Sequence, residues 1–242
     1  MSHQTTALVS GASSGIGESI ALRLLDSGNT VIALQRRAPS FYHERLFFYP
    51  VDLSIAEQAG TVAGEVVAHH DIGMLVNNAG ANHPGPLMEQ TLEDFEHAVN
   101  LNLRAALLLT QAVVPSMRAR GYGRIVNIAS RALLGKADRA VYSMTKAGIV
   151  GLTRTVALEL GGDGITVNAV APGPIATELF RCGHPANSPQ LRKVLDSIVV
   201  KRMGTPADIA RAVAFFLSPD AGFITGQTLF VCGGASIGSG GF

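Results

Sequence analysis

The stretch that decides the fold of this chain runs Thr5-Thr6-Ala7-Leu8-Val9-Ser10-Gly11-Ala12-Ser13-Ser14-Gly15-Ile16-Gly17. Its first half is a short apolar run typical of a buried β-strand, and a helical pattern follows over residues 15–27. The three glycines permit a tight turn and a close approach to the backbone. The start of the helix offers free N–H donors suited to a pyrophosphate. The stretch therefore predicts a nucleotide-binding turn, although its spacing, G-x3-G-x-G, differs from the G-x-G-x-x-G fingerprint.

The rest of the chain continues this alternation of short apolar runs and longer helical patterns. The predicted strands are residues 5–10, 30–35, 46–51, 73–77, 124–129, 166–170 and 228–231. The predicted helices lie near 15–27, 54–69, 91–119, 141–160 and 206–217. Such alternation implies right-handed crossovers. We therefore expect an α/β fold: one Rossmann-type domain over residues 1–242, with a doubly wound parallel sheet of about seven strands and helices on both faces.

Residues 172–203 break the rhythm. They are long and irregular, with prolines at positions 172, 174, 185 and 189 and a short helix expected near 190–199. An insertion after the carboxyl end of a strand is where an α/β enzyme usually builds a cover for its substrate. We interpret this segment as a substrate lid.

Composition excludes several classes of protein. The chain has 47% hydrophobic and 15% charged residues, and its 19 basic and 18 acidic side chains leave a formal charge of +1. Nothing in this balance calls for nucleic acid or an anionic membrane as a partner. The longest apolar stretch, residues 101–114, is interrupted by polar side chains and does not resemble a membrane span.

Two further features concern location and metals. Cys182 and Cys232 lie far apart and are interpreted as reduced thiols. The first strand begins near Thr5, leaving no room for a signal peptide, so we expect a soluble, cytoplasmic protein. The run His69-His70-Asp71 ends a helix, and no cluster has metal-ligand spacing, so no catalytic metal is expected.

The run Tyr142-Ser143-Met144-Thr145-Lys146 carries the candidate chemistry. On a helix over 141–160, the i, i+4 spacing places the phenol and the ammonium on one face. A neighbouring cation favours the phenolate and so provides an acid/base group near neutral pH. Beside a nucleotide turn, this pair indicates that proton and hydride move to and from a carbonyl.

The ordered motifs of the chain resemble those of the short-chain dehydrogenase/reductase family over essentially its whole length. They are Gly11-x3-Gly15-x-Gly17, Asp52, Asn77-Asn78-Ala79-Gly80, Asn102, Ser130, Tyr142-x3-Lys146 and Pro172-Gly173. The resemblance implies an NAD(P)-dependent oxidoreductase that transfers hydride between nicotinamide and a secondary alcohol or ketone. It implies that Asn102 supports the water of a proton relay and Ser130 orients the substrate oxygen. Tyr142 would exchange the proton, and Lys146 would lower its pKa and hold the ribose hydroxyls.

The same resemblance implies a set of cofactor contacts. Asp52 would meet the adenine ring, and the turn at Pro172 would surround the nicotinamide. Apart from Arg36 and Arg37, which are treated below, the set is Gly11, Ser13, Ser14, Gly15, Ile16, Gly17, Asp52, Leu53, Asn78, Ala79, Gly80, Tyr142, Lys146, Pro172, Gly173, Ile175 and Thr177.

The end of the second strand bears on the choice of cofactor. An acidic residue at this position would accept a hydrogen bond from the ribose 2′-hydroxyl of NAD. Here the position is occupied by Gln35, and Arg36 and Arg37 follow. Guanidinium groups suit a phosphate monoester, so NADP is favoured over NAD. Ser14 occupies a position at which NADP-using relatives often have a basic residue. The alternative is that Arg36 and Arg37 are solvated charges on a loop.

Two arginines flank the inferred chemistry and bear on the substrate. Arg139 precedes Tyr142 in a segment that lines the substrate cleft of relatives, and Arg181 belongs to the predicted lid. Together with Ser130 and Tyr142 they are the predicted substrate contacts. A carboxylate, sulfonate or phosphate on the substrate would make the arginines a clamp. The alternative is a pair of exposed loop charges.

Other functions stay open at this point. The chain also resembles 3-oxoacyl-[acyl-carrier-protein] reductases, whose docking surface is typically basic at the positions of Gly121 and Asp163. Neither residue is basic here, although Arg118 and Arg120 could substitute. A polyol, a hydroxy acid or an acyl-CoA alcohol also remains possible as substrate.

Two alternatives come from outside the reductases. A catalytically silent dinucleotide-binding regulator would share the fold, but Tyr142 and Lys146 are both present. Epimerases and dehydratases of the family generally have longer chains and another glycine spacing. In the family the helices near 91–119 and 141–160 pair across a dimer interface, usually within a tetramer. We therefore expect a homo-oligomer, although a thickly buried helix would give the same apolar pattern.

Overall fold

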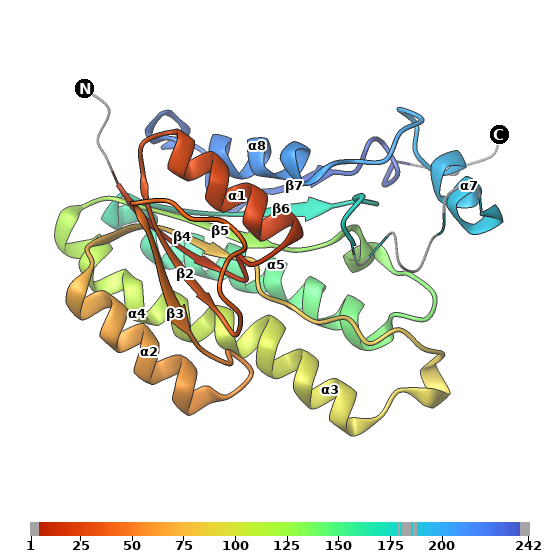
Figure 1. Cartoon of the computed structure of the whole chain (residues 1–242), viewed down its shortest axis with the longest axis horizontal. Coiled ribbons are helices and arrows are strands. Elements are labelled where there is room, and N and C mark those ends of the chain that lie inside the picture. Colours follow the sequence, from red (N-terminus) through yellow and green to blue (C-terminus); the bar gives the residue numbers. More distant parts are fainter. Residues whose placement is uncertain (1–4, 179, 181–184, 186–187, 238–242) are drawn as a thin grey trace.

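The core of the molecule is a single seven-stranded parallel sheet (Figure 1). The computed structural model describes residues 5–178, 180, 185 and 188–237. The strands are β1 (Thr6–Ser10), β2 (Thr30–Gln35), β3 (Leu46–Pro50), β4 (Ile72–Asn77), β5 (Gly123–Ile128), β6 (Ile165–Pro172) and β7 (Thr228–Val231). Their order across the sheet is β3-β2-β1-β4-β5-β6-β7. The predicted α/β sheet is confirmed.

Helices cover both faces of this sheet, as the sequence predicts. One face carries α1 (Gly15–Asp26) and α8 (Pro206–Leu217), which pack on each other and on β1 and β5 (Figure 1). The other carries α2 (Ala56–His69), α4 (Ala105–Arg120) and α5 (Ala140–Leu160). None of the helices in the described part of the chain is both long and apolar enough to cross a membrane.

The long helical pattern predicted over 91–119 is built from three pieces. Helix α3 (Leu92–Val99) begins at a capping box, in which Thr91 and Asp94 satisfy each other's backbone N–H groups. A π-helical turn over Asn100–Arg104 then leads into α4. Asn102 lies in this turn with only 2% of its surface exposed. Short π-helical turns inside α-helices are frequent at functional sites.

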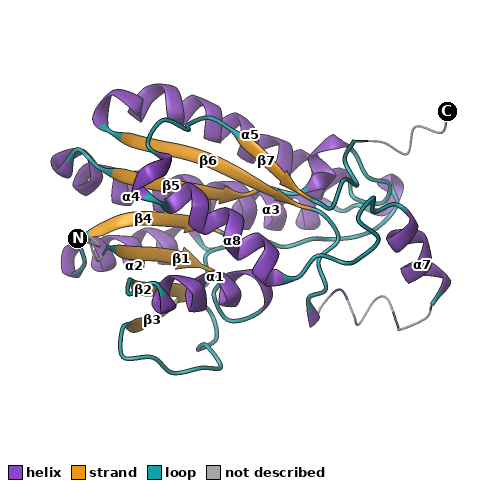
Figure 2. Cartoon of the chain, turned by 90° about the horizontal axis from the view of Figure 1, so that it is seen from above, coloured by secondary structure: helices purple, strands orange, loops and turns teal. Residues whose placement is uncertain are grey.

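The chain reverses direction across the sheet between β1 and β4, which pair with each other. In open α/β sheets a ligand binds beyond the carboxyl ends of the strands at such a switch point. Figure 2 shows the long loops and helix α7 (Pro189–Asp196), which matches the predicted short helix, beyond those ends. The structure thus places the glycine turn and the predicted catalytic motifs on one edge of the sheet.

Candidate active site

Ser130, Tyr142 and Lys146 converge where β5 ends and α5 begins. Ser130 follows β5 and caps a short 3-10 helix, its Oγ accepting the N–H of Ala132 at 3.1 Å. Tyr142 and Lys146 lie on the first turns of α5. Ser130 also forms a side-chain hydrogen bond with Tyr142. The structure therefore brings Ser130 together with the Tyr142 and Lys146 pair, which belong to two separate sequence motifs.

Lys146 is held by the strand rather than by solvent. Only 4% of its surface is exposed, and its Nζ donates to the carbonyl oxygen of Ile128 at 2.8 Å. The ammonium lies 5.7 Å from the centre of the Tyr142 ring. Burial lowers the pKa of Lys146 to about 8, because the charged form loses its hydration.

The acidity of Tyr142 differs from the expectation that Lys146 lowers its pKa. In the cofactor-free chain burial raises the pKa of Tyr142, and this effect outweighs the hydrogen bond from Ser130 and the charge of Arg139, which both lower it. The i, i+4 spacing brings the ammonium near the phenol, as expected. The structure packed around the two side chains also shields them from water, and burial penalises each charged form.

Asn102 connects the π-helical turn to the loop after β4 and to the catalytic helix. Its Oδ1 accepts the N–H of Ala81 at 2.7 Å, and its Nδ2 donates to the carbonyl of Ala81 at 3.0 Å and to Thr145 Oγ1 at 2.9 Å. Thr145 in turn donates to the carbonyl of Tyr142 at 2.9 Å. Sequence reasoning missed Thr145, although its place three residues after Tyr142 puts it on the same side of the helix.

Gly80 lines the space between these groups. A Cβ on Gly80 would lie 3.1 Å from Asn102 Oδ1 and 3.4 Å from Lys146 Nζ. The neighbouring loop is fixed by Ser10, whose Oγ accepts the N–H groups of Asn78 and Ala79 at 2.9 and 3.0 Å. Any side chain at position 80 would therefore enter the space beside Lys146.

The predicted cofactor residues share one edge of the sheet. They follow β1 (Gly11, Ser13, Ser14, Gly15, Ile16, Gly17), β2 (Arg36, Arg37), β3 (Asp52, Leu53) and β4 (Asn78, Ala79, Gly80), and they end or follow β6 (Pro172, Gly173, Ile175, Thr177). Gly15 has a φ of +59° and faces Thr177, whose Cγ2 would lie 3.3 Å from a Cβ at position 15. The turn after β1 and the loop after β6 therefore meet across the site.

The turn itself fits a dinucleotide pyrophosphate. Ser14 precedes α1 without capping it, so its side chain accepts none of the N–H groups of the first turn. A Cβ on Gly17 would lie 2.0 Å from the carbonyl oxygen of Gly11, which packs the helix end tightly against the turn. Asn78 holds this arrangement from the side by donating to the carbonyls of Ser10 and Gly11.

The end of β2 fits an adenosine carrying a 2′-phosphate. Gln35 is buried, its Oε1 accepts the N–H of Ala12, and its Nε2 finds no partner among the described residues. Arg36 is 76% exposed and lies 3.9 Å from Asp52. Asp52 has a lowered pKa, chiefly because Ser54 hydrogen-bonds its carboxylate. Gln35 therefore holds the place where NAD-binding chains have an acid, and the loosely paired guanidinium of Arg36 follows it.

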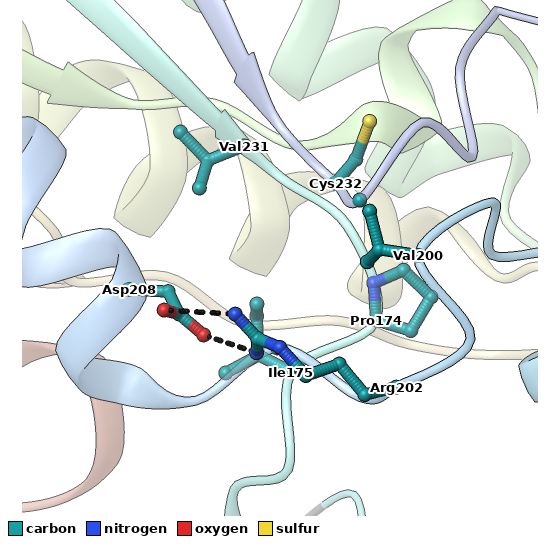
Figure 3. Close-up of a pocket in the computed structure, with 9 residues that line it drawn as sticks. Pro174, Ile175, Val200, Arg202, Asp208, Val231 and Cys232 are labelled. Carbon is teal, nitrogen blue, oxygen red and sulfur yellow. Dashed lines mark hydrogen bonds and ion pairs between the residues drawn. The ribbon is translucent and has the colours of Figure 1, made fainter.

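Near the start of the predicted lid, Gly173 packs against Cys232, a buried free thiol that follows β7. A hollow here is lined by Pro174, Ile175, Val200, Val231 and Cys232, and the ion pair of Arg202 with Asp208 lies at its side (Figure 3). Ser130, Tyr142 and Lys146 do not line it. The hollow therefore lies beside the start of the 172–203 segment and not at Ser130, Tyr142 and Lys146.

The structure describes only one of the two arginines predicted to contact the substrate. Arg139 precedes α5 and acts on Tyr142 through its charge. Arg181, like Cys182, lies outside the described residues.

His83, His97 and Asp94 form a polar cluster that the sequence analysis did not predict. His83 Nε2 lies 2.9 Å from His97 Nδ1, and His83 Nδ1 lies 3.1 Å from Asp94. These side chains bond to one another and surround no common centre. Within the described ranges, no group of three His, Cys, Asp or Glu side chains could hold a metal ion.

Comparison with known proteins places this geometry in a family. A family model described as enoyl-(acyl carrier protein) reductase matches residues 11–236. BbsD of Thauera aromatica, a (2S)-[(R)-hydroxy(phenyl)methyl]succinyl-CoA dehydrogenase subunit, is 41% identical over 96% of this chain and 96% of its own. The 3-oxoacyl-[acyl-carrier-protein] reductase FabG of Staphylococcus epidermidis is 37% identical over 95% of this chain and 98% of its own.

A solved structure gives the same result. ElxO with NADP bound superimposes with a TM-score of 0.91 at 29% identity, over 97% of this chain and 100% of the other. The chain therefore belongs to this family of short-chain dehydrogenases and reductases, NAD(P)-dependent oxidoreductases that act on CH–OH and C=O groups.

Proposed function

We propose that this chain interconverts a ketone and a secondary alcohol on an acyl thioester, with NADP preferred over NAD. The observation that carries the proposal is the convergence of Ser130, Tyr142 and Lys146 on the edge of the sheet that also holds the glycine turn. A hydroxyl, a phenol and a buried ammonium supply hydrogen bonding, proton exchange and positive charge within one site.

Each side chain has a role in the proposed reaction. When bound, the nicotinamide cofactor supplies or accepts the hydride. In the reductive direction Tyr142 donates its proton to the substrate oxygen as that oxygen becomes negative, and in the oxidative direction it takes the proton back. Ser130 donates a hydrogen bond to the same oxygen. Lys146 stabilises the phenolate and holds ribose hydroxyls, and Asn102 supports the water that returns the proton.

A thioester is supported by the relatives and by the charges on the surface. BbsD is named for a succinyl-CoA thioester and FabG for a carrier-protein thioester. Arg118 and Arg120, which could replace a basic docking surface, are both paired. Arg118 Nε lies 2.6 Å from Asp163, and Arg120 pairs with Asp71. Neutralised arginines attract an acidic carrier protein weakly, which favours a coenzyme A thioester over 3-oxoacyl-carrier-protein reduction.

The preference for NADP rests on the end of β2. The exposed guanidinium of Arg36 suits phosphate oxygens, Arg37 follows on the same loop, and Gln35 adds no negative charge at the end of the strand. An acid at position 35 would have repelled a 2′-phosphate. The NADP bound to ElxO agrees with this assignment.

The proposed enzyme is a cytoplasmic homo-oligomer, either a dimer or a tetramer. Helices α4 and α5 leave Leu107, Met144 and Leu158 exposed by 41, 58 and 88%. Exposed apolar side chains on neighbouring helices suit a second copy of the chain. Light scattering coupled to size-exclusion chromatography tests this assembly, and a monomeric mass would contradict it.

The decisive experiment follows NADPH and NADH oxidation with matched 3-oxoacyl substrates carried on coenzyme A or on acyl carrier protein, with Tyr142→Phe as control. We expect faster turnover with NADPH and with the coenzyme A thioester, and no turnover in the control. Faster turnover of the carrier-protein thioester would assign the 3-oxoacyl-[acyl-carrier-protein] reductase function instead. Cofactor binding with no turnover of any carbonyl compound would support the catalytically silent regulator.

A further inference from the structure

We propose that Arg139, together with Arg131 and Lys136, forms an anion-binding site at the mouth of the active site, and that this site takes a carboxylate or phosphate of the substrate. The inference rests on the proposed function and deepens it, because it states which part of the thioester the protein recognises. The three cations lie on one short segment, residues 131–139, whose neighbours on either side are the catalytic Ser130 and the catalytic helix.

The segment is rich in positive charge that nothing described neutralises. It carries three cations and one acid, Asp138. Among the ion pairs formed by the described residues, none involves Arg131, Lys136 or Arg139. Elsewhere on the surface, Arg118, Arg120 and Arg202 each reach a carboxylate. Three cations without an ion pair therefore stand on one short segment beside Ser130 and the helix of Tyr142.

Arg139 is fixed in place by a strained turn. Asp138 has a φ of +59°, an uncommon conformation for a residue other than glycine. Its carbonyl oxygen accepts the N–H of Gly85 at 3.0 Å and the Nη1 of Arg139 at 2.7 Å. Such outliers persist only where the surroundings hold them, and they cluster at ligand-binding sites. The carbonyl thus ties the segment to the loop after β4 and restrains the guanidinium beside Tyr142.

The other two cations extend the site outward. Arg131 donates through Nη1 to the carbonyl oxygen of Ala235 at 3.0 Å, which leaves its remaining donors free for a ligand. Lys136 has a lowered pKa, caused first by burial and then by the charges of Arg139 and Arg131. The three groups therefore lie within electrostatic reach of one another. Like charges held together destabilise each other, and a bound anion would relieve that repulsion.

The chemistry of the site selects oxygen anions. A guanidinium binds carboxylate or phosphate through parallel hydrogen bonds, whereas a neutral acyl chain offers it nothing. An acyl thioester has two sources of such a group: a carboxylate on the acyl part and the phosphates of coenzyme A. Arg139 directly precedes the helix of Tyr142, and Lys136 lies earlier in the segment, so the two variants report on different parts of one site.

The test uses three substrates that share a 3-oxo group. The neutral probe is 3-oxohexanoyl pantetheine, the phosphate probe is 3-oxohexanoyl-coenzyme A, and the carboxylate probe is 3-oxoadipyl pantetheine. The wild type is compared with Arg139→Gln, Lys136→Gln and a matched control, Arg154→Gln, which removes an exposed arginine from the same helix that Arg139 precedes. The readout is kcat/KM for each anionic probe divided by kcat/KM for the neutral probe.

We expect this ratio to fall about tenfold or more in Arg139→Gln for at least one anionic probe, and to stay unchanged in Arg154→Gln. A fall with 3-oxoadipyl pantetheine identifies a carboxylate, and a fall with the coenzyme A thioester identifies phosphate. Equal ratios in the wild type, Arg139→Gln and Lys136→Gln would overturn the proposal.

A binding measurement separates this proposal from the proposed function. If the wild type turns over none of the three probes, the thioester function fails. Calorimetric titration of the wild-type chain with coenzyme A and with adipate then decides the anion site by itself. Binding that weakens at least tenfold in Arg139→Gln supports it, and no binding to the wild type overturns it.

Discussion

The amide of Asn102 binds the backbone of Ala81 at both ends, with Oδ1 accepting its N–H at 2.7 Å and Nδ2 donating to its carbonyl at 3.0 Å. Because Nδ2 also donates to Thr145 Oγ1, one buried side chain holds the loop after β4 against the catalytic helix. Asn102 therefore positions the groups around Lys146 in addition to any role toward water.

Asn102→Ala should reduce both stability and turnover. The substitution leaves both backbone groups of Ala81 and the Thr145 hydroxyl without these partners, and each lost partner of a buried polar group costs about 1–3 kcal/mol. We expect a fall of at least 2 kcal/mol in the free energy of urea-induced unfolding and a fall of about tenfold or more in kcat. Asn100→Ala, in the same π-helical turn, is the control. Equal effects of the two substitutions would remove the special place of Asn102.

Tyr142→Phe should abolish turnover while cofactor still binds. The substitution removes only the phenolic oxygen, so the acid/base group is lost and the packing of the ring is kept. Turnover is measured by nicotinamide absorbance and NADPH affinity by fluorescence titration. Residual activity close to the wild type would show that another group exchanges the proton.

Lys146 makes stability depend on pH in the cofactor-free chain. Its pKa falls from an ordinary 10.5 in the unfolded chain to about 8 in the folded one. Between these values the unfolded state binds more protons, so stability rises with pH, and the full penalty is present below pH 8. At 1.36 kcal/mol per pKa unit the difference approaches about 3 kcal/mol.

The measurement subtracts a variant that lacks the charge. Urea unfolding of the wild type and of Lys146→Met is compared from pH 7 to pH 10, so that the contributions of all other groups cancel. We expect the wild type to gain stability relative to the variant above pH 8. A difference that stays constant with pH would show that the lysine keeps its ordinary pKa inside the fold.

Gln35→Glu should reverse the cofactor preference. The carboxylate can still accept the N–H of Ala12, but it replaces a neutral amide by a negative charge at the end of β2. Repulsion of a 2′-phosphate should lower the ratio of NADPH to NADH affinity by about tenfold or more, and a ribose 2′-hydroxyl gains an acceptor. An unchanged ratio would mean that position 35 does not set the cofactor preference, whether or not Arg36 and Arg37 do.

The sheet could be predicted from the sequence because its signal is local. Alternating apolar runs and helical patterns mark all seven strands, and the order of motifs identifies the family. The π-helical turn at 100–104 could not be predicted, because a shift in backbone hydrogen bonding leaves the side-chain period almost unchanged.

The electrostatics of the site were less predictable because they depend on distant partners. Arg118 and Arg120 find Asp163 and Asp71, which lie 45 and 49 residues away, while Arg139 finds no carboxylate among the described residues. The spacing of Tyr142 and Lys146 indicates their proximity but not that both are buried, and burial sets the direction in which both pKa values move.

The contacts of the glycine turn have a consequence for how the chain acquires its activity. Ser10 and Asn78, which fix the turn, are 68 residues apart, and Gly15 meets Thr177 across an even longer loop. Pairing of strands that are far apart in the sequence loses loop-closure entropy before the stabilising contacts form, so such pairing occurs late in folding. During refolding, helix content should recover in stopped-flow circular dichroism before NADPH binding does. The affinity for cofactor is thus a property of the completed sheet, and a newly made chain forms helices before it can bind the cofactor.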